Sequence, residues 1–96
     1  MDKYNKIKKV YPTDNYILIC EFESGIKKKY DIKPLVKKYA IFKKLVTNKE
    51  LFSQVIVDAG GYGISWDNEI DLAAEEIWEN GEDFNSIAVY HSHKQK

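Results

Sequence analysis

The sequence predicts an α+β fold in which a small antiparallel sheet of about five strands has helices packed on one face. Residues 7–32 read as three strands separated by turn residues, and the apolar spacing changes from a period of two to a helical period after Pro34. Two more strand-like segments and a final helical segment follow. The predicted order is therefore β-β-β-α-β-β-α, in a single domain of residues 1–96 with its core in residues 7–80.

The first three predicted strands are Ile7 to Tyr11, Tyr16 to Phe22 and Ile26 to Ile32. The turn sequences "PTDN" and "ESG" separate them, and both contain residues that favour tight turns. The second strand is apolar on both faces, which places it in the middle of a sheet or beneath a covering element. The third alternates between apolar and charged residues, as expected for a strand with one solvated face.

A helical segment is predicted after the third strand. Pro34 fits the first turn of a helix. The apolar positions that follow are spaced four, three and four residues apart, which forms one stripe on a helix: Leu35, Tyr39, Phe42 and Val46. A break near residues 40–41 would divide this segment into two short helices. Asn48 is placed to cap one further turn that brings Leu51 and Phe52 to the core.

Gly60 and Gly61 lie between two predicted strands, residues 54–58 and 62–66, and Gly63 lies at the start of the second. A nucleotide-binding loop needs a strand, then glycines, then a helix whose N-terminus faces the phosphate. Here the glycines are followed by a second strand, and no Lys-Ser or Lys-Thr pair comes after them. This arrangement favours a hairpin connection between antiparallel strands over a phosphate-binding loop.

The last predicted helix runs from Leu72 to Glu79, with Asp71 as its N-cap and Gly81 as the residue that stops it. Residues 82–96 are expected to form a short strand around residues 87–90 or a loose tail.

The net charge is zero, but its distribution along the chain is uneven. Residues 1–49 carry 13 Lys and 5 acids, whereas residues 50–96 carry 2 Lys and 10 acids, so the halves carry +8 and −8. We expect the halves to pack together and partly cancel each other's charge; the alternative is a dipolar surface that docks a charged partner or a second copy. The chain has no Arg, which lowers the expectation of sequence-specific nucleic-acid recognition.

Other features bound the location and the chemistry. No apolar run approaches the length of a membrane span, and the N-terminus lacks an apolar stretch of signal-peptide length, so we expect a cytoplasmic protein without a membrane partner. The single cysteine, Cys20, excludes an internal disulfide and is expected in the core. A chain of 96 residues supplies one core but not a deep pocket as well, and we expect no cofactor.

The candidates for catalysis or metal binding have simpler interpretations. A hydrolase or a hard-metal site would need carboxylates to converge in a cleft. The available carboxylates lie at predicted turns and at a predicted helix cap: Asp58, Asp67, Glu69 and Asp71. His91 and His93 could share a transition metal on a strand, but no further Cys or His completes a ligand set, so a solvated tail is favoured. We therefore expect no catalytic and no metal-binding residues.

Two sets of residues are candidates for contacting a partner. The first could form one basic face, near Tyr30 and Tyr39, that binds a nucleic acid or a protein, although a solvated surface is the simpler interpretation. Its members are Lys27, Lys28, Lys29, Lys37, Lys38, Lys43 and Lys44. The second set is Trp66 and Trp78, which are either core residues or partner-facing anchors, with the core favoured.

The order and spacing of motifs in residues 10–80 resemble those of the small bacterial family called domain of unknown function 2442. The matching segments are "VYPTDNYILICEFESGIKKKYDIKPLV", "FKKL", "LFSQVIVD" and "ISWDNEIDLAAEEIW". The positions that carry the likeness are Val10, Pro12, Tyr16, Leu18, Phe22, Gly25, Asp31, Phe42, Leu45, Phe52, Trp66, Asp71 and Leu72. The sequence departs from the family at Glu69, where a glycine is usual, and at Ile77 and Trp78, where Leu-Tyr is usual.

The resemblance implies a small α+β domain with helices on one side of an antiparallel sheet, and it carries over no catalytic residue. Some members of the family are fused to helix-turn-helix domains and others lie beside genes for small toxin-like proteins. The resemblance therefore implies an antitoxin-like or regulatory module, here of the stand-alone type.

Two functional hypotheses follow. The first is a non-enzymatic protein-binding module that acts through a sheet edge or an acidic helix face, with a toxin-like protein or a second copy as its partner. The alternative is a nucleic-acid-binding protein that uses the lysine-rich face. A small hydrolase built on the carboxylates of residues 58–71 is a third and weaker hypothesis.

Overall fold

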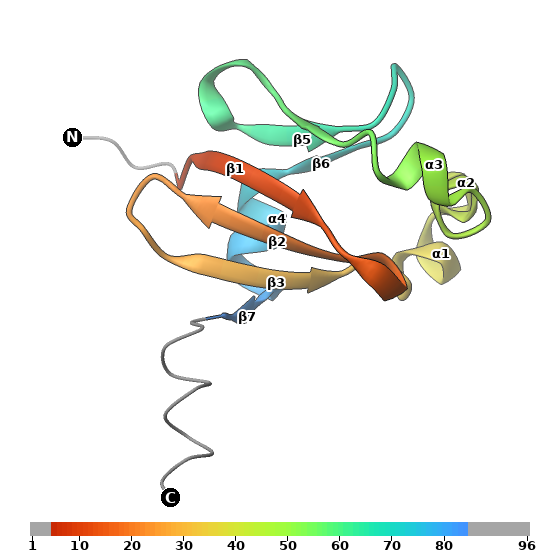
Figure 1. The fold of residues 1–96 in the computed structure, drawn as a ribbon, viewed down its shortest axis with the longest axis horizontal. Helices are drawn as coiled ribbons and strands as arrows, with labels where there is room; N and C mark the ends of the chain where they lie inside the picture. The colour runs from red at the N-terminus through yellow and green to blue at the C-terminus, as the bar shows by residue number, and fades with distance from the viewer. Residues whose placement is uncertain (1–4, 85–96) are drawn as a thin grey trace, which may run out of the picture.

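The structure, a computed structural model, describes residues 5–84. It confirms the α+β class (Figure 1), but the strands form two antiparallel sheets rather than one, with the orders β1-β2-β3-β7 and β4-β5-β6. In chain order the elements are β1 (Ile7–Pro12), η1 (Asp14–Tyr16), β2 (Ile17–Phe22), β3 (Lys27–Asp31), α1 (Leu35–Lys38), η2 (Ala40–Phe42), α2 (Lys43–Val46), α3 (Lys49–Phe52), β4 (Ile56–Val57), η3 (Ala59–Gly61), β5 (Gly63–Ser65), β6 (Asp71–Ala73), α4 (Ala74–Asn80) and β7 (Glu82–Asp83).

The first sheet follows the sequence pattern closely. The predominantly apolar strand β2 pairs with β1 on one side and β3 on the other, as predicted. Its inward side chains, Leu18, Cys20 and Phe22, are buried, whereas Ile17 and Ile19 lie half-buried on the outer face. The alternation therefore determines which side of β2 faces the core.

The glycine cluster forms the predicted hairpin connection. Strands β4 and β5 are antiparallel, and the 3-10 turn η3 joins them. Gly60 and Gly61 have φ values of 82° and 80°, a conformation that residues with a Cβ rarely adopt. A Cβ on Gly61 would also lie 2.7 Å from the carbonyl oxygen of Ile7, so this turn packs closely against the start of β1.

The segment after Pro34 is broken into the short helices α1, η2 and α2. The break lies at Tyr39, one residue before the predicted position, where the backbone is extended at φ −135° and ψ 103°. Leu35 and Phe42 remain buried, but Tyr39 is 55% exposed, so the prediction of one continuous core stripe is wrong at this position.

The predicted cap of the following turn is confirmed. Oδ1 of Asn48 accepts a hydrogen bond of 3.1 Å from the backbone N–H of Leu51 at the start of α3. Phe52, at the end of the same turn, is buried.

The start of the last helix differs from the prediction. Residues 71–73 form strand β6, which pairs with β5, and α4 begins only at Ala74. Asp71 is therefore a strand residue and not a helix cap, because the ladder with β5 holds its backbone extended. Gly81 ends α4 as predicted, and its N–H donates a 2.8 Å hydrogen bond to the carbonyl of Ile77.

The chain then forms β7, which pairs with β3. The strand predicted around residues 87–90 lies outside the described residues.

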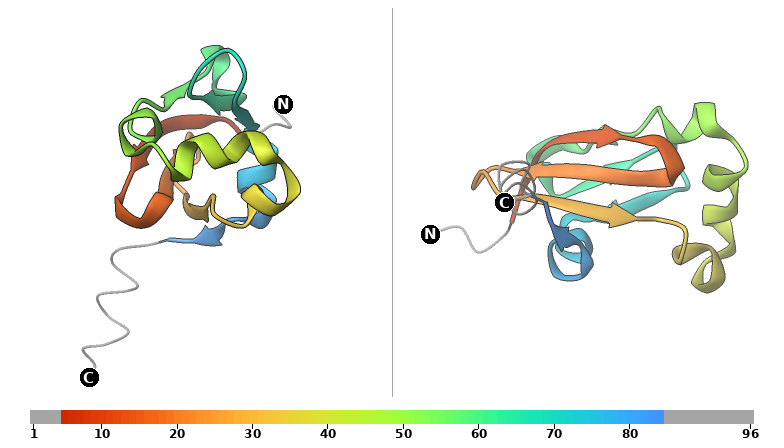
Figure 2. Two further views of the ribbon diagram at one scale, coloured as in Figure 1. Left: turned by 90° about the vertical axis from the view of Figure 1, so that its right-hand side faces the viewer. Right: turned by 60° about the horizontal axis from the view of Figure 1, so that its bottom comes forward.

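The two sheets and α4 enclose the core. Figure 1 shows the first sheet in front and the second sheet with α4 behind it, whereas α1, α2 and α3 cross one end of the two sheets (Figure 2). The helices are thus divided between the back and one end. The core combines residues from both sheets and most helices, namely Ile7, Leu18, Cys20, Phe22, Tyr30, Ile32, Leu35, Phe42, Leu45, Phe52, Val55, Ile64, Trp66, Ile70, Ala74 and Ile77.

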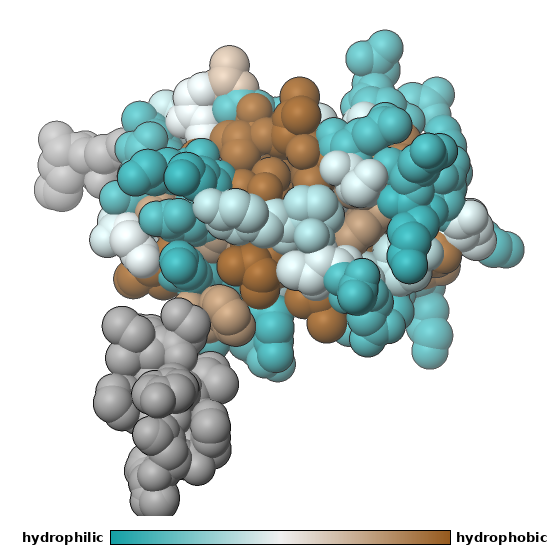
Figure 3. Space-filling model, viewed as in Figure 1, coloured by the Kyte–Doolittle hydropathy of each residue, from teal (hydrophilic) through white to brown (hydrophobic). Residues whose placement is uncertain are grey.

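The face of the first sheet carries small apolar patches among hydrophilic residues (Figure 3). No helix within residues 5–84 has the length and apolar character needed to cross a membrane.

Candidate functional site

The three lysines of β3 do not all point into solvent. Lys28 lies on the core side of the strand, where its Nζ is 2.7 Å from Oδ1 of Asp83 and 4.9 Å from the centre of the Trp78 ring. Its side chain is only 13% exposed. Lys29 pairs with Glu82 at 3.7 Å, and Lys27 is half-buried. Two of the three lysines of β3 are thus paired with the acids of β7.

The remaining candidate lysines lie on α1 and α2. Lys37, Lys38 and Lys43 are exposed, whereas the Nζ of Lys44 lies 3.4 Å from Glu69 and 3.8 Å from Asp67. The seven lysines therefore belong to separate elements, with Lys29 and Lys38 lining the same groove. The pairing of lysines from the first half with acids from the second agrees with mutual charge compensation.

The two tryptophans have different environments. Trp66 is 6% exposed, its Nε1 donates a 3.0 Å hydrogen bond to the carbonyl of Phe52, and its ring packs against Phe42 and Phe52. It is a core residue, so it is not partner-facing. Trp78 is half-buried, with its ring edge-on to Phe22 and covered by Lys28.

The carboxylates considered for catalysis serve local structure. Asp58 accepts a 2.6 Å hydrogen bond from the hydroxyl of Ser65 on the neighbouring strand. Oδ1 of Asp67 accepts hydrogen bonds from the backbone N–H groups of Glu69 and Ile70, which closes the turn before β6. Among residues 5–84, no three His, Cys, Asp or Glu side chains gather closely enough to hold a metal ion.

The thiol and imidazole candidates do not contribute to a described site. Burial raises the pKa of the Cys20 thiol to about 12, so at neutral pH the nucleophilic thiolate is essentially absent. His91 and His93 lie outside the described residues.

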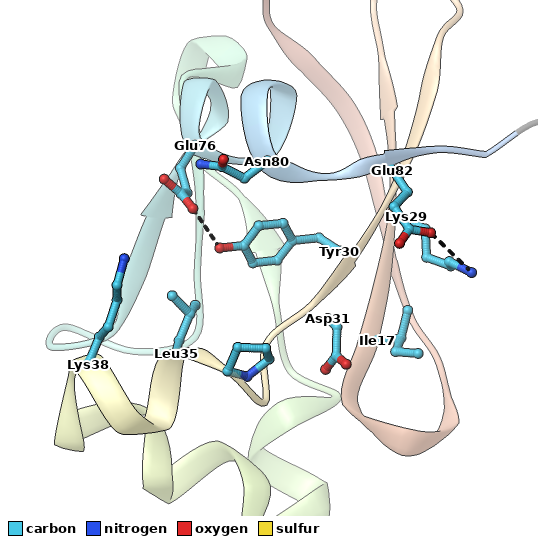
Figure 4. A pocket seen from close by; sticks show the side chains of 10 residues that line it. Ile17, Lys29, Tyr30, Asp31, Leu35, Lys38, Glu76, Asn80 and Glu82 are labelled. Atoms are coloured by element: carbon cyan, nitrogen blue, oxygen red, sulfur yellow. Dashed lines mark hydrogen bonds and ion pairs between the residues drawn. The ribbon is translucent and has the colours of Figure 1, made fainter.

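A groove runs along the boundary between α1 and α4. Its first part has a volume of about 530 Å³ and lies between β3, α1 and α4. Figure 4 shows Tyr30 reaching from β3 toward Glu76, with Leu35 and Lys38 on the α1 side. The Tyr30 hydroxyl donates a 2.8 Å hydrogen bond to Oε2 of Glu76. Burial, together with this carboxylate, raises the pKa of Tyr30 above its ordinary value.

The second part of the groove has a volume of about 350 Å³ and lies between the α1–η2 segment and β6. It shares Leu35, Lys38 and Glu76 with the first part, so the two parts adjoin each other along these side chains. We refer to this whole surface as the α1–β6 groove. Its two parts have volumes within the range that ligand sites occupy in proteins.

Strand β6 presents an unpaired edge to the groove. It is the last strand of its sheet and pairs only with β5. On either side of β6, the N–H of Trp66 donates to the carbonyl of Ile70 and the N–H of Ala74 donates to the carbonyl of Tyr62. In an antiparallel ladder every second residue is bonded to the neighbouring strand, and the backbone groups of the residues between them point the other way. Asp71 and Ala73 occupy those outward positions. Within residues 5–84, neither of these N–H groups donates a hydrogen bond to an acceptor.

Exposed apolar side chains border the same edge. Tyr39 is 55% exposed and Ile41 is 38% exposed, and both line the part of the groove beside β6. An exposed aromatic and an exposed aliphatic residue beside a groove are typical of protein-interaction surfaces. The sequence pattern predicted Tyr39 in the core stripe of a helix and near the basic face, and it gave no signal for Ile41.

A sequence model of the family described as Protein of unknown function (DUF2442) matches residues 7–83. That range contains every strand and helix of the structure, from β1 to β7. No curated protein and no solved structure gives a significant match. The match confirms the resemblance seen in the motifs, and the family description assigns no activity.

Proposed function

This chain belongs to the DUF2442 family, and we propose that it is a non-enzymatic, antitoxin-like protein-binding module that holds a partner protein in the α1–β6 groove. One observation carries the proposal: the unpaired edge of β6 opens into a groove bordered by the exposed side chains of Tyr39 and Ile41. Backbone groups without a partner and exposed apolar side chains are both satisfied when a second polypeptide binds.

The remaining polar groups support binding rather than catalysis. Asp58 and Asp67 hold local turns, Lys44 pairs with Glu69, and Cys20 is buried with its thiol protonated. An enzyme would need such groups to converge on a substrate, whereas these are committed to separate local contacts.

Nucleic-acid binding is supported less well by the arrangement of the lysines. Lys28 and Lys29 are directed to the acids of β7, and Lys44 is directed to those before β6. A nucleic acid would therefore have to contact the exposed lysines of α1 and α2, and its affinity would decrease steeply as the salt concentration rises.

The test uses the full chain as bait in a native extract of its source organism. The variant Tyr39→Ala/Ile41→Ala removes the apolar border of the groove. The matched control is Tyr11→Ala/Ile26→Ala, since Tyr11 on β1 and Ile26 in the connection before β3 are 44% and 43% exposed and do not line the groove. Capture is measured by quantitative mass spectrometry at low and high salt.

We expect one protein to be retained by the wild type and by the control, and its recovery to fall at least about tenfold with the groove variant. Equal recovery with the groove variant, or recovery that disappears after nuclease treatment, would contradict the proposal.

A further inference from the structure

We infer that the occupant of the α1–β6 groove is an extended segment of the partner protein in which basic and apolar residues alternate, and that it adds to β6 as an antiparallel strand. This inference rests on the proposed function and specifies the chemistry of the partner. Three properties of the groove support it: its backbone groups, the direction of its side chains and its charge.

The backbone of β6 has room for one more strand. The N–H and C=O of Asp71 and the N–H of Ala73 point away from β5, according to the hydrogen-bond pattern of the ladder. The carbonyl of Ala73 is engaged differently, because Ala73 is the N-cap of α4. Three outward groups remain. An antiparallel partner residue opposite Asp71 could exchange two hydrogen bonds with it, and a neighbouring partner residue could accept the third from Ala73.

Side chains on β6 alternate between the core and the surface. Ile70 is buried and Leu72 is half-buried against the core, whereas Asp71 and Ala73 are exposed. On an added strand, the residue opposite Leu72 would point to the same face as Leu72. That face borders the apolar side chains of Leu35, Ile41 and Phe42, which line the groove. An apolar residue is therefore expected at this position of the partner.

The residue of the partner opposite Asp71 would point to the other face, beside the exposed carboxylate. A lysine or an arginine would form a favourable cross-strand pair there. The groove as a whole favours the same sign of charge. Its two parts are lined by five acids and two lysines, namely Asp31, Glu69, Asp71, Glu76, Glu82, Lys29 and Lys38. Three of the acids are paired with lysines, Asp31 with Lys33, Glu69 with Lys44 and Glu82 with Lys29, which leaves Asp71 and Glu76 against Lys38. A basic segment is thus complementary to the groove, and an acidic one is not.

Ala73 allows a variant that blocks strand addition without disturbing the fold. Its φ of −72° lies within the range of proline, its side chain is exposed, and no hydrogen bond to a described residue uses its N–H. Ala73→Pro should therefore fold normally while it removes one of the outward donors. Ala73→Val is the matched control, because it adds similar bulk and keeps the N–H.

The probe is a short blocked peptide of alternating lysine and leucine, which is titrated into the isotopically labelled full chain and followed by amide NMR shifts. We expect shifts at Asp71 and Ala73, and a dissociation constant that is unchanged by Ala73→Val but raised at least about tenfold by Ala73→Pro. The same peptide with glutamate in place of lysine should bind at least about tenfold more weakly. Thermal unfolding of both variants serves as the check on folding.

Several results would overturn the inference. The first two are equal affinity of the peptide for Ala73→Pro and Ala73→Val, and no binding at millimolar peptide. The third is a set of amide shifts confined to α1 and α2. The fourth is a concentration-dependent dimer of the wild type whose interface is β6. Repeating the capture experiment with Ala73→Pro as bait distinguishes partner binding in the groove from strand addition at β6. If its recovery depends on Tyr39 and Ile41 but not on Ala73→Pro, the groove binds a partner and strand addition is wrong. If neither variant lowers recovery, both proposals fail.

Discussion

Replacing Trp66 by alanine is expected to lower the free energy of unfolding by about 3–5 kcal/mol. The indole is buried, and its ring contacts Phe42 of η2 and Phe52 of α3. Its removal would leave a cavity and deprive the carbonyl of Phe52 of its donor. Since domains of this size have stabilities of about 5–15 kcal/mol, the variant would be close to unfolded.

Urea unfolding of the variant, followed by circular dichroism, measures this loss. The same substitution at the other tryptophan is the control, because Trp78 is half-buried and the ammonium group of Lys28 lies over its ring. Trp78→Ala should therefore cost clearly less than Trp66→Ala. A larger cost at Trp78 would mean that Trp66 is not the centre of the aromatic core.

The stability of the protein should fall steeply in alkali. The pKa of Cys20 is raised from 9.0 to about 12 by burial. In the unfolded chain the thiol loses its proton above pH 9, whereas in the folded protein it keeps the proton until about pH 12. The unfolded state therefore binds fewer protons in this interval, and the free energy of unfolding decreases as pH rises, by about 4 kcal/mol in total. Below about pH 9 the thiol is protonated in both states, so its titration adds no pH dependence to the free energy of unfolding.

Tyr30 acts in the same direction, because its pKa is raised above its ordinary value of 10.0 by burial and by Glu76. Urea midpoints measured between pH 8 and pH 11.5 test the prediction. Cys20→Ala is the control: it should be less stable than the wild type at pH 8, but its stability should decline less as pH rises. An equal decline in both proteins would show that the buried thiol is not responsible.

The sequence predicted the elements whose signals are local. The apolar character of both faces in Tyr16 to Phe22 identified the central strand, the oxygen of Asn48 identified the start of α3, and the glycines between residues 60 and 63 identified a hairpin. Each of these signals depends on a few neighbouring residues and on their own backbone preferences. They are therefore readable without knowledge of the tertiary structure.

The predictions that were wrong depended on distant contacts. Asp71 has the chemistry of a helix cap, but it lies opposite Ser65 in the ladder with β5. The hydrogen bonds of the flanking residues, such as Trp66 N–H to the carbonyl of Ile70, hold this segment extended and override the local preference. Tyr39 has the spacing of a core residue, but the break in the helix turns it outward. The division into two sheets likewise follows from β4 lying beside β1 without pairing to it.

The sequence indicated the type of surface that could bind a partner, but not where on the fold that surface lies. The sequence favoured a sheet edge or an acidic helix face, and the groove contains an edge, β6, and the acidic helix α4. Its walls come from residues 35–42 and 69–76, which only the tertiary fold brings together. The alternation of Ile70, Asp71, Leu72 and Ala73 was the one signal of an additional strand, and it is short enough to be read as the first turn of a helix.

Hydrogen exchange of the full chain, measured with and without its captured partner, tests the central claim most directly. We predict that partner binding slows the exchange of the amides of Asp71 and Ala73, since their N–H groups then gain acceptors. The amides of Lys37 and Lys43, exposed lysines of α1 and α2 that do not line the groove, should show no comparable change. Protection confined to α1 and α2, with the β6 amides exchanging at the same rate in both states, would contradict the assignment of the α1–β6 groove as the binding site.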